Sequence, residues 1–459
     1  MTTDYKHPLY EKFAPLWTKV RDACAGEDAV KERGETYLPN PAPTAENAAQ
    51  RYARYKMRAV YFNATGRTLA GLIGVAYAKW PEIVTSNKAL MQDADGSGVG
   101  LIGQSQLVLS DILQTGRAGL LTDWPKKEIG RRLRSRAEAE ALGLVPRILA
   151  YTAEQILTWQ HSNGMLTRVV LQETREEYEA GEVKQYPQLR ELVLNADRGY
   201  TILLWVKYSQ TGKYILVERV TTGLSYIPFT FVGAVNNDAS PDIPPLLDLA
   251  NLNLAHYRNS ADYEESAFVM GQPQAVLTGI TDDWKEKMGV LQFGAGNAWV
   301  LPADAAAMLL QVSPNTLAKE AMSDKERMMS LLGARLMAPT ESAKTATQSA
   351  AETKAAYSQL SLACDNVSAA YTKALQWAEG GTSLSASQSF AIDTDFSELM
   401  LDANAIREIV AAWQAGAIPQ SDAWAALRKL RVIDPGKTDE KVAGEIEAQG
   451  PALSLNEAA

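Results

Sequence analysis

The stretch that decides the fold is Pro-Pro-Leu-Leu-Asp-Leu-Ala-Asn-Leu-Asn-Leu-Ala-His-Tyr, residues 244–257. Its two prolines suit the first turn of a helix, where a missing N–H removes no hydrogen bond. Apolar side chains then recur near one face of the predicted helix, at Leu247, Leu254, Tyr257 and Ala261. The Gly271-Gln-Pro273 sequence stops this helix, because proline cannot continue it.

A compact β-containing insertion follows at residues 274–312. It holds the short apolar runs 275–277 and 299–301, and a short helix is predicted at 282–288. An insertion of this size is too small to form an independently stable domain. We therefore expect it to pack against copies of itself, in a ring or another repeated assembly.

The predicted short helix of the insertion also carries the candidate residues for partner contact. An exposed tryptophan among mixed charges suits a protein interface. The alternative is that this tryptophan is buried between neighbouring copies of the insertion. The candidate residues are Asp282, Asp283, Trp284, Lys285 and Lys287.

A second helix is predicted at 317–336, followed by a small polar loop and a long helix at 349–379. One side of the second helix is expected to carry Leu317, Ala321, Met328 and Leu332. The long helix has an apolar seam in steps of three and four, at Tyr357, Leu360, Cys364, Val367, Tyr371, Ala374 and Ala378. Ordinary core packing explains this seam better than a coiled coil does.

The N-terminal part is predicted to be helical at 8–33, where Pro15 could kink or divide the helix, and at 45–78. Residues 93–100 superficially resemble a calcium loop. The twelfth position of that loop is Gln104, however, and not the bidentate glutamate that calcium requires. We therefore predict a loop leading into a helix at 101–114, which ends at Gly116 and precedes a strand at 118–122.

Short strands dominate residues 147–231, so the predicted fold class is α+β. The clearest strands are residues 167–171, 200–205, 214–217 and 227–232. The basic cluster at 126–136 has no interleaved aromatic residues. It is interpreted as a solvated helix face, with a patch for the DNA backbone as the alternative.

Composition limits the function classes. The 459 residues are 46% hydrophobic, enough for two or more structural domains. Lysine and arginine number 45 against 54 aspartates and glutamates, so 45 − 54 gives a net charge of −9. An acidic chain is unsuited to clamping DNA, because phosphate neutralisation supplies much of the affinity. It can still surround DNA loosely.

Nothing in the sequence indicates catalysis. The three histidines share no motif with cysteine or carboxylate partners, and no G-x-S-x-G, H-E-x-x-H or P-loop sequence occurs. We expect a non-enzymatic protein without a metal or cofactor, although a site assembled from distant residues remains an alternative. Two cysteines 340 residues apart, and no signal-like or membrane-spanning segment, suit a reducing cytoplasm.

Several stretches together resemble a tailed-bacteriophage portal protein, the head-to-tail connector, in a family once classed as a domain of unknown function. The stretches follow the family order over more than half of the chain. One departure, Lys79-Trp80-Pro81, replaces consecutive prolines and affects a local turn. The resembling stretches are residues 7–11 through 26–31, 61–67, 116–119, and 246–250 through 256–263.

The resemblance implies an α+β portal-type fold in a dodecameric ring around a channel for double-stranded DNA. It implies a place at one capsid vertex of a virion assembled in the host cytoplasm. The implied partners are the terminase, a head–tail adaptor and the major capsid protein, with no membrane. Its parts would be an α/β wing (1–243), a stem helix (244–271), an α/β clip (272–313), a second stem helix (314–336), a tunnel loop (337–348), the long helix with the rest of the wing (349–403), and a small helical crown with a tail (404–459).

The implied tunnel loop would face the DNA. Lys344 would add a sparse ring of positive charge, and the small polar residues would offer replaceable hydrogen bonds to phosphates. Alternatively, Lys344 pairs with Glu341 or points into solvent. The candidate residues are Thr340, Glu341, Ser342, Lys344, Thr345, Thr347 and Gln348. A virion scaffold without a DNA channel, or a soluble α+β enzyme, are the alternative functions.

Overall fold

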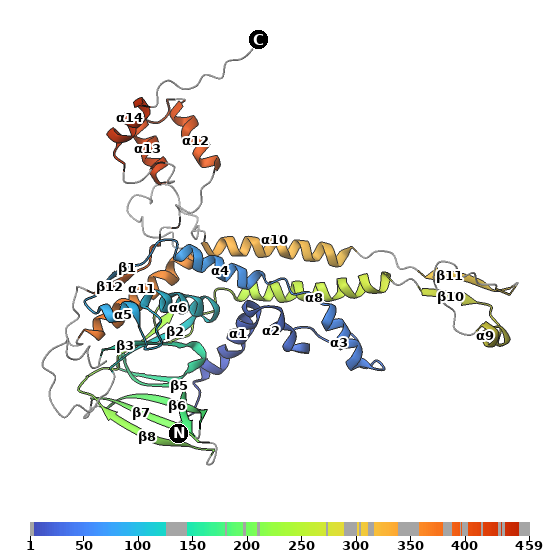
Figure 1. The fold of residues 1–459 in the computed structure, drawn as a ribbon, viewed down its shortest axis with the longest axis horizontal. Coiled ribbons are helices and arrows are strands. Elements are labelled where there is room, and N and C mark those ends of the chain that lie inside the picture. The colour runs from blue at the N-terminus through green and yellow to red at the C-terminus, as the bar shows by residue number, and fades with distance from the viewer. Residues whose placement is uncertain are drawn as a thin grey trace, which may run out of the picture.

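The computed structural model describes residues 4–124, 145–179, 181–195, 199–208, 212–271, 274–288, 301–302, 304–310, 316–337, 358–379, 388–394, 396, 403–414, 416–429, 433 and 437–448. These residues form an α+β protein, as the sequence predicts (Figure 1). Helices and a small sheet make the central body, a five-stranded sheet lies on one side of it, and a two-helix arm projects from it.

The N-terminal region contains four helices, α1 (Pro8–Ala25), α2 (Glu27–Glu32), α3 (Ala48–Arg58) and α4 (Ala64–Ala76), and a 3-10 turn, Gly34–Thr36. Pro15 lies inside α1 without dividing it, and the break falls at Gly26, whose φ is +110°. The single helix expected at 45–78 is wrong. The chain leaves the helix at Ala59, and Asn63 starts α4 by accepting a hydrogen bond from the Gly66 N–H.

The main core lies between α6 (Leu101–Thr115), α11 (Gln359–Ala378) and a three-stranded antiparallel sheet. Its strands are β3 (Arg147–Thr152), β2 (Arg117–Asp123) and β9 (Phe229–Gly233), in that order. The described seam residues of α11, from Leu360 to Ala378, are all buried here, which confirms the core-packing interpretation. At the edge of this body lie α5 (Lys88–Gln92) and the short antiparallel pair β1 (Glu82–Val84) and β12 (Ser389–Ala391).

Gly116 connects α6 to β2 as expected. Its φ of +70° suits glycine, and a Cβ there would lie 2.2 Å from the carbonyl oxygen of Asp242. The predicted loop before α6 is also confirmed. Its Asp93 carboxylate accepts hydrogen bonds from the N–H groups of Gly96 and Gly98.

The five-stranded sheet is an antiparallel meander of β4 (Ile156–Ser162), β5 (Met165–Glu179), β6 (Glu182–Asn195), β7 (Gly199–Lys207) and β8 (Tyr214–Thr221). A 3-10 turn, Ala153–Gln155, precedes it. Trp17 of α1 is fully buried in the core that forms on this sheet. β8 is an edge strand and exposes Ile215, Leu216 and Val217.

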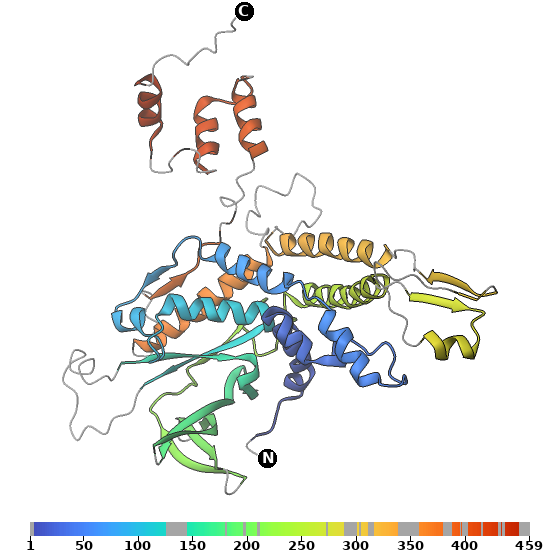
Figure 2. The same ribbon diagram turned by 45° about the vertical axis from the view of Figure 1, so that its right-hand side comes forward.

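The arm consists of α8 (Leu247–Met270) and α10 (Leu317–Met337), which run side by side (Figure 2). At its tip lie β10 (Gln274–Thr278), α9 (Asp282–Met288) and β11 (Ala306–Leu310). Both arm helices and α9 were predicted from the sequence, but β11 was not.

Three short helices end the described chain: α12 (Ala403–Gln414), α13 (Gln420–Lys429) and α14 (Asp439–Ala448). They form a separate group in both views (Figures 1 and 2). Arg428 of α13 pairs with Asp439 of α14. Ala423, Trp424 and Val442 are buried within this group.

Candidate assembly site: the helical arm

The base of the arm is held by one buried asparagine. The Asn253 Oδ1 atom accepts hydrogen bonds from Tyr61 OH (3.0 Å), Thr65 N (3.0 Å) and Thr65 Oγ1 (2.9 Å). Its Nδ2 atom donates to the Phe62 carbonyl at 2.7 Å. The asparagine is fully buried, so these bonds fix α8 against the start of α4 and the segment before it.

Helix α3 covers one flank of α8 further out. Tyr55 OH donates to Asp262 Oδ1 at 2.6 Å, and Arg58 pairs with Glu265. The Arg58 guanidinium also lies over the Phe268 ring, 4.3 Å from its centroid. Burial and the Asp262 carboxylate raise the pKa of Tyr55 well above its usual range, so Tyr55 stays a hydrogen-bond donor at neutral pH.

On the other flank, α10 pairs with α8 through His256 and Glu326. The two side-chain atoms, Nε2 and Oε1, lie 3.1 Å apart. His256 is buried with a side chain 3% exposed, whereas that of Glu326 is 52% exposed. This contact also fixes the relative level of the two antiparallel helices along the arm.

The outer half of the arm has no buried core among the described residues. Ala261 is the last buried residue of α8, and Met329 is the first buried residue of α10. Beyond them the helices expose Phe268, Val269 and Leu317. A helix draws most of its stability from packing of an apolar face, and beyond Ala261 and Met329 the polar contacts from α3 do not provide such packing within the subunit.

The apolar side predicted for α10 differs from the side that the structure buries. Leu317 is 71% exposed and Met328 is 53% exposed, while Met329, Gly333 and Leu336 are the buried positions. The helix is turned so that Gly333 lies against Thr68 of α4. The pattern of apolar residues alone did not reveal this rotation, because both faces of α10 carry large apolar side chains.

The tip is a small unit. β10 and β11 pair antiparallel from Gln274–Leu310 to Thr278–Ala306. Asp282 and Asp283 are exposed on α9, Trp284 is half-buried, and Lys285 and Lys287 belong to the same helix. The structure therefore brings the five predicted partner-contact residues together at the end of the arm.

The predicted tunnel-loop residues, Thr340, Glu341, Ser342, Lys344, Thr345, Thr347 and Gln348, lie outside the described residues. The same is true of the basic cluster at 126–136 and of residues 349–357 of the predicted long helix. Their predicted roles stay predictions.

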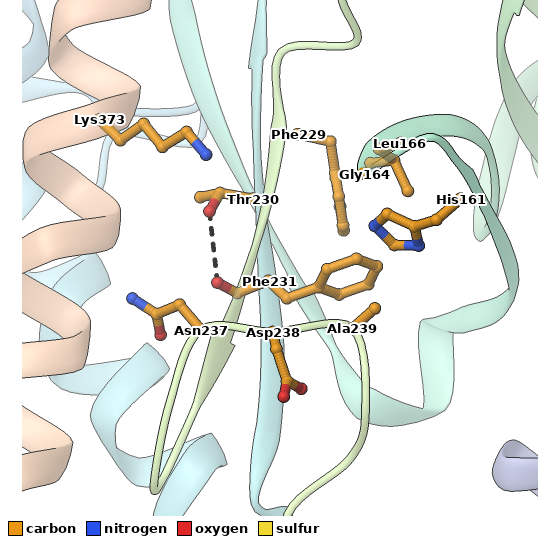
Figure 3. A pocket seen from close by; sticks show the side chains of 10 residues that line it. All are labelled: His161, Gly164, Leu166, Phe229, Thr230, Phe231, Asn237, Asp238, Ala239 and Lys373. Atoms are coloured by element: carbon orange, nitrogen blue, oxygen red, sulfur yellow. Dashed lines mark hydrogen bonds between the residues drawn. The ribbon is translucent and has the colours of Figure 1, made fainter.

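A pocket of about 450 Å³ lies away from the arm, between β4, β9, α11 and the loop after β9 (Figure 3). Its lining brings together His161, Asp238 and Lys373 with the aromatic residues Phe229 and Phe231. Thr230 donates a hydrogen bond to the Phe231 carbonyl at 3.3 Å. Within the described part of the chain, no hydrogen bond joins His161, Asp238 and Lys373 to one another.

Arg117 lies behind this pocket, with its guanidinium 3.8 Å from the Trp159 ring centroid and 4.4 Å from that of Phe231. It is only 2% exposed, and its Nη1 atom donates to the Ala239 carbonyl at 2.8 Å. Burial lowers the pKa of Arg117 to about 9. Burial, together with the nearby guanidinium, also lowers the pKa of His7 and His161.

The described residues contain no cluster of three histidine, cysteine or acidic side chains placed to hold a metal ion. Nor is any described helix long and apolar enough to cross a membrane. Cys24 and Cys364 are free thiols.

Comparison with known proteins matches residues 245–380 to a family model described as a domain of unknown function (DUF4055). No curated protein sequence matches the chain. Two solved structures align over 79% of this chain and 89% of their own, each with a TM-score of 0.41. They are described as "Neck of native GTA particle computed with C12 symmetry", at 15% identity, and "Neck of empty GTA particle computed with C6 symmetry", at 13% identity.

Sequence reasoning missed two features that position the arm, the buried Asn253 and the separate helix α3. Asn253, a polar residue between the leucines of α8, was a signal for a buried polar contact. The charged first half of the predicted helix at 45–78 indicated a surface element. It forms the separate helix α3 because its partners lie on α8, which is distant in the sequence.

Proposed function

We propose that this chain is the subunit of a phage portal ring, which forms the channel for genome packaging and ejection at one capsid vertex. The observation that carries the proposal is the projecting arm. Its outer half lacks a core within the subunit, and its tip is a two-stranded antiparallel sheet with a short helix.

Both features favour a repeated assembly. An isolated two-stranded hairpin is at best marginally stable in water, and the arm helices beyond Ala261 and Met329 have no buried face. Copies of the arm arranged around an axis would cover one another. A cyclic assembly gives every subunit the same neighbours and leaves no unmatched surface.

The sequence resemblance supports the portal assignment over other rings. In that assignment the arm is the stem, its tip is the clip, and residues 337–348 form the tunnel loop. The net charge of −9 per subunit suits a channel that holds DNA without gripping it, because each phosphate neutralised would slow sliding.

The proposed partners follow from the same arrangement. Asp282, Asp283, Trp284, Lys285 and Lys287 at the tip would contact the terminase and later a head–tail adaptor. The body would contact the major capsid protein. We propose no catalytic role, so a separate ATPase would supply the force that moves DNA.

The mass of the assembled particle tests the proposal. A ring of about twelve subunits with a central opening in electron micrographs is the expected result. A monomer that binds a small molecule in the pocket near Lys373 would favour an enzyme. A closed shell or solid aggregate would favour a scaffold without a channel.

A further inference from the structure

The arm has two different flanks at the same level. α3 and α10 both contact α8 and lie on opposite sides of it in both views (Figures 1 and 2). One copy therefore presents α3 on one side and α10 on the other. Two different surfaces on opposite sides are what a head-to-tail, ring-closing contact needs.

The positions of α3 and α10 along the arm follow from their side-chain contacts with α8. His256 pairs with Glu326, and the two helices are antiparallel, so six residues outward from each, about 9 Å along the axis, Asp262 lies level with Glu320. Tyr55 of α3 bonds to the same Asp262. The C-terminal half of α3 and the first turn of α10 thus lie at one height along the arm.

The outward faces at this height complement each other. On α3, Met57 is 70% exposed, and the exposed Arg54 lies one turn before it. On α10, Leu317 is 71% exposed, and the exposed Glu320 lies one turn after it. At these four positions each flank therefore pairs one large apolar side chain with one charged side chain, and the two charges have opposite signs, although α10 also exposes Lys319 beside Glu320. Neither Arg54 nor Glu320 has an ion-pair partner among the described residues.

We propose that the α3 flank of one copy docks against the α10 flank of the next copy, with Arg54 facing Glu320 and Met57 packing on Leu317. The inference rests on the proposed ring and names the surface that closes it. A rotation about an axis along the arm preserves height, so it brings these level surfaces together. The contact also covers the outer half of the arm, which lacks a core in the single subunit.

Charge reversal tests this contact in the full-length chain. Arg54→Glu and Glu320→Arg, made singly, should each raise the concentration for half-assembly about tenfold or more, since like charges are then opposed. The double variant should return to within about threefold of the unchanged chain, because the pair is restored with reversed polarity. Sedimentation velocity over a concentration series measures each midpoint. Arg219→Glu, an exposed reversal on β8, is the matched control and should assemble normally.

The outcomes separate the contact from the ring. Rings that form normally with both single variants, or a double variant that stays defective, overturn the contact and leave the portal proposal standing. An unchanged chain that forms no ring overturns both. If a reversal variant fails to fold, the pair Arg54→Cys and Glu320→Cys decides. Oxidation should link copies into a ladder on a denaturing gel, and the absence of that ladder overturns the contact.

Discussion

The Nε2 atom of His256 lies 3.1 Å from the Oε1 atom of Glu326, and this contact joins the outgoing and returning helices of the arm. It lies close to the level at which the buried core of the arm ends. Inward, α8 and α10 pack against α4 and the body of the subunit. Outward, α8 has no buried residue beyond Ala261, and the described part of α10 has none before Met329.

Replacing Glu326 with alanine should lower the free energy of unfolding of the unassembled subunit by about 1 kcal/mol, because buried His256 loses its hydrogen-bond partner. Thermal unfolding at a concentration below assembly measures the effect. Lys319→Ala, at an exposed site on the same helix, should change the midpoint little. Equal midpoints for the two variants would show that the contact adds no stability.

Asn253→Leu should cost about 3 kcal/mol, since it leaves the Thr65 N–H and the Phe62 carbonyl buried without their partner. Urea unfolding of the subunit gives the comparison. The control is Asn251→Ala two residues earlier, where an exposed side chain accepts one hydrogen bond from Lys19. A leucine variant as stable as this control would refute the anchoring role of Asn253.

Gly116→Ala should destabilise the chain by about 2 kcal/mol or more, because its φ is +70° and a Cβ would meet the Asp242 carbonyl oxygen. Gly74→Ala is the matched control within helix α4, where the new Cβ meets nothing within 4 Å. That change should stabilise the chain by about 0.5–1 kcal/mol. Calorimetric midpoints for both variants check the opposite signs.

Cys24 should resist alkylation in the folded chain. Burial raises the pKa of its thiol to about 12 from an ordinary 9.0, so at pH 8 the thiolate fraction, and with it the rate, falls about a thousandfold. As the pH rises from 9 toward 12, the Cys24 thiol loses its proton in the unfolded chain before it does so in the folded chain. The contribution of Cys24 to the free energy of unfolding therefore falls over that pH range. Iodoacetamide labelling followed by peptide mass measurement distinguishes Cys24 from Cys364. Equal rates with and without urea would contradict the prediction.

Lys344→Ala should alter packaging or retention of DNA while rings still assemble, if the tunnel-loop proposal is correct. The reason is that a single positive charge per subunit would be repeated around the constriction. Packaged DNA per particle and the mass of the ring are the two measurements. Unchanged packaging and retention would remove the proposed role. Lys88→Ala, at an exposed site on α5, serves here as a charge-matched control outside the loop.

The sequence predicted the elements whose signals are local. Prolines, Gly271 and apolar spacing placed α8, α9 and α10 to within a few residues, and Gly116 placed the end of α6. The break at 59–63 was missed because its partners are distant: Val60 bonds to Ser260 and Tyr61 to Asn253, about 200 residues away. β11 was missed because its register depends on β10. Periodicity grouped Leu317 and Met328 on one side of α10, but it does not say which apolar face packs within the subunit.

If the proposed ring forms, the outer half of the arm makes the folding of each subunit depend on the subunit concentration. A surface that only a neighbour covers gains its stability by mass action, so the ordered fraction of that half should rise with subunit concentration. At low concentration, newly made subunits would present Phe268, Val269 and Leu317 to proteases and chaperones. Assembly would then act as quality control, because copies that find no neighbour would be removed before they could block a growing particle.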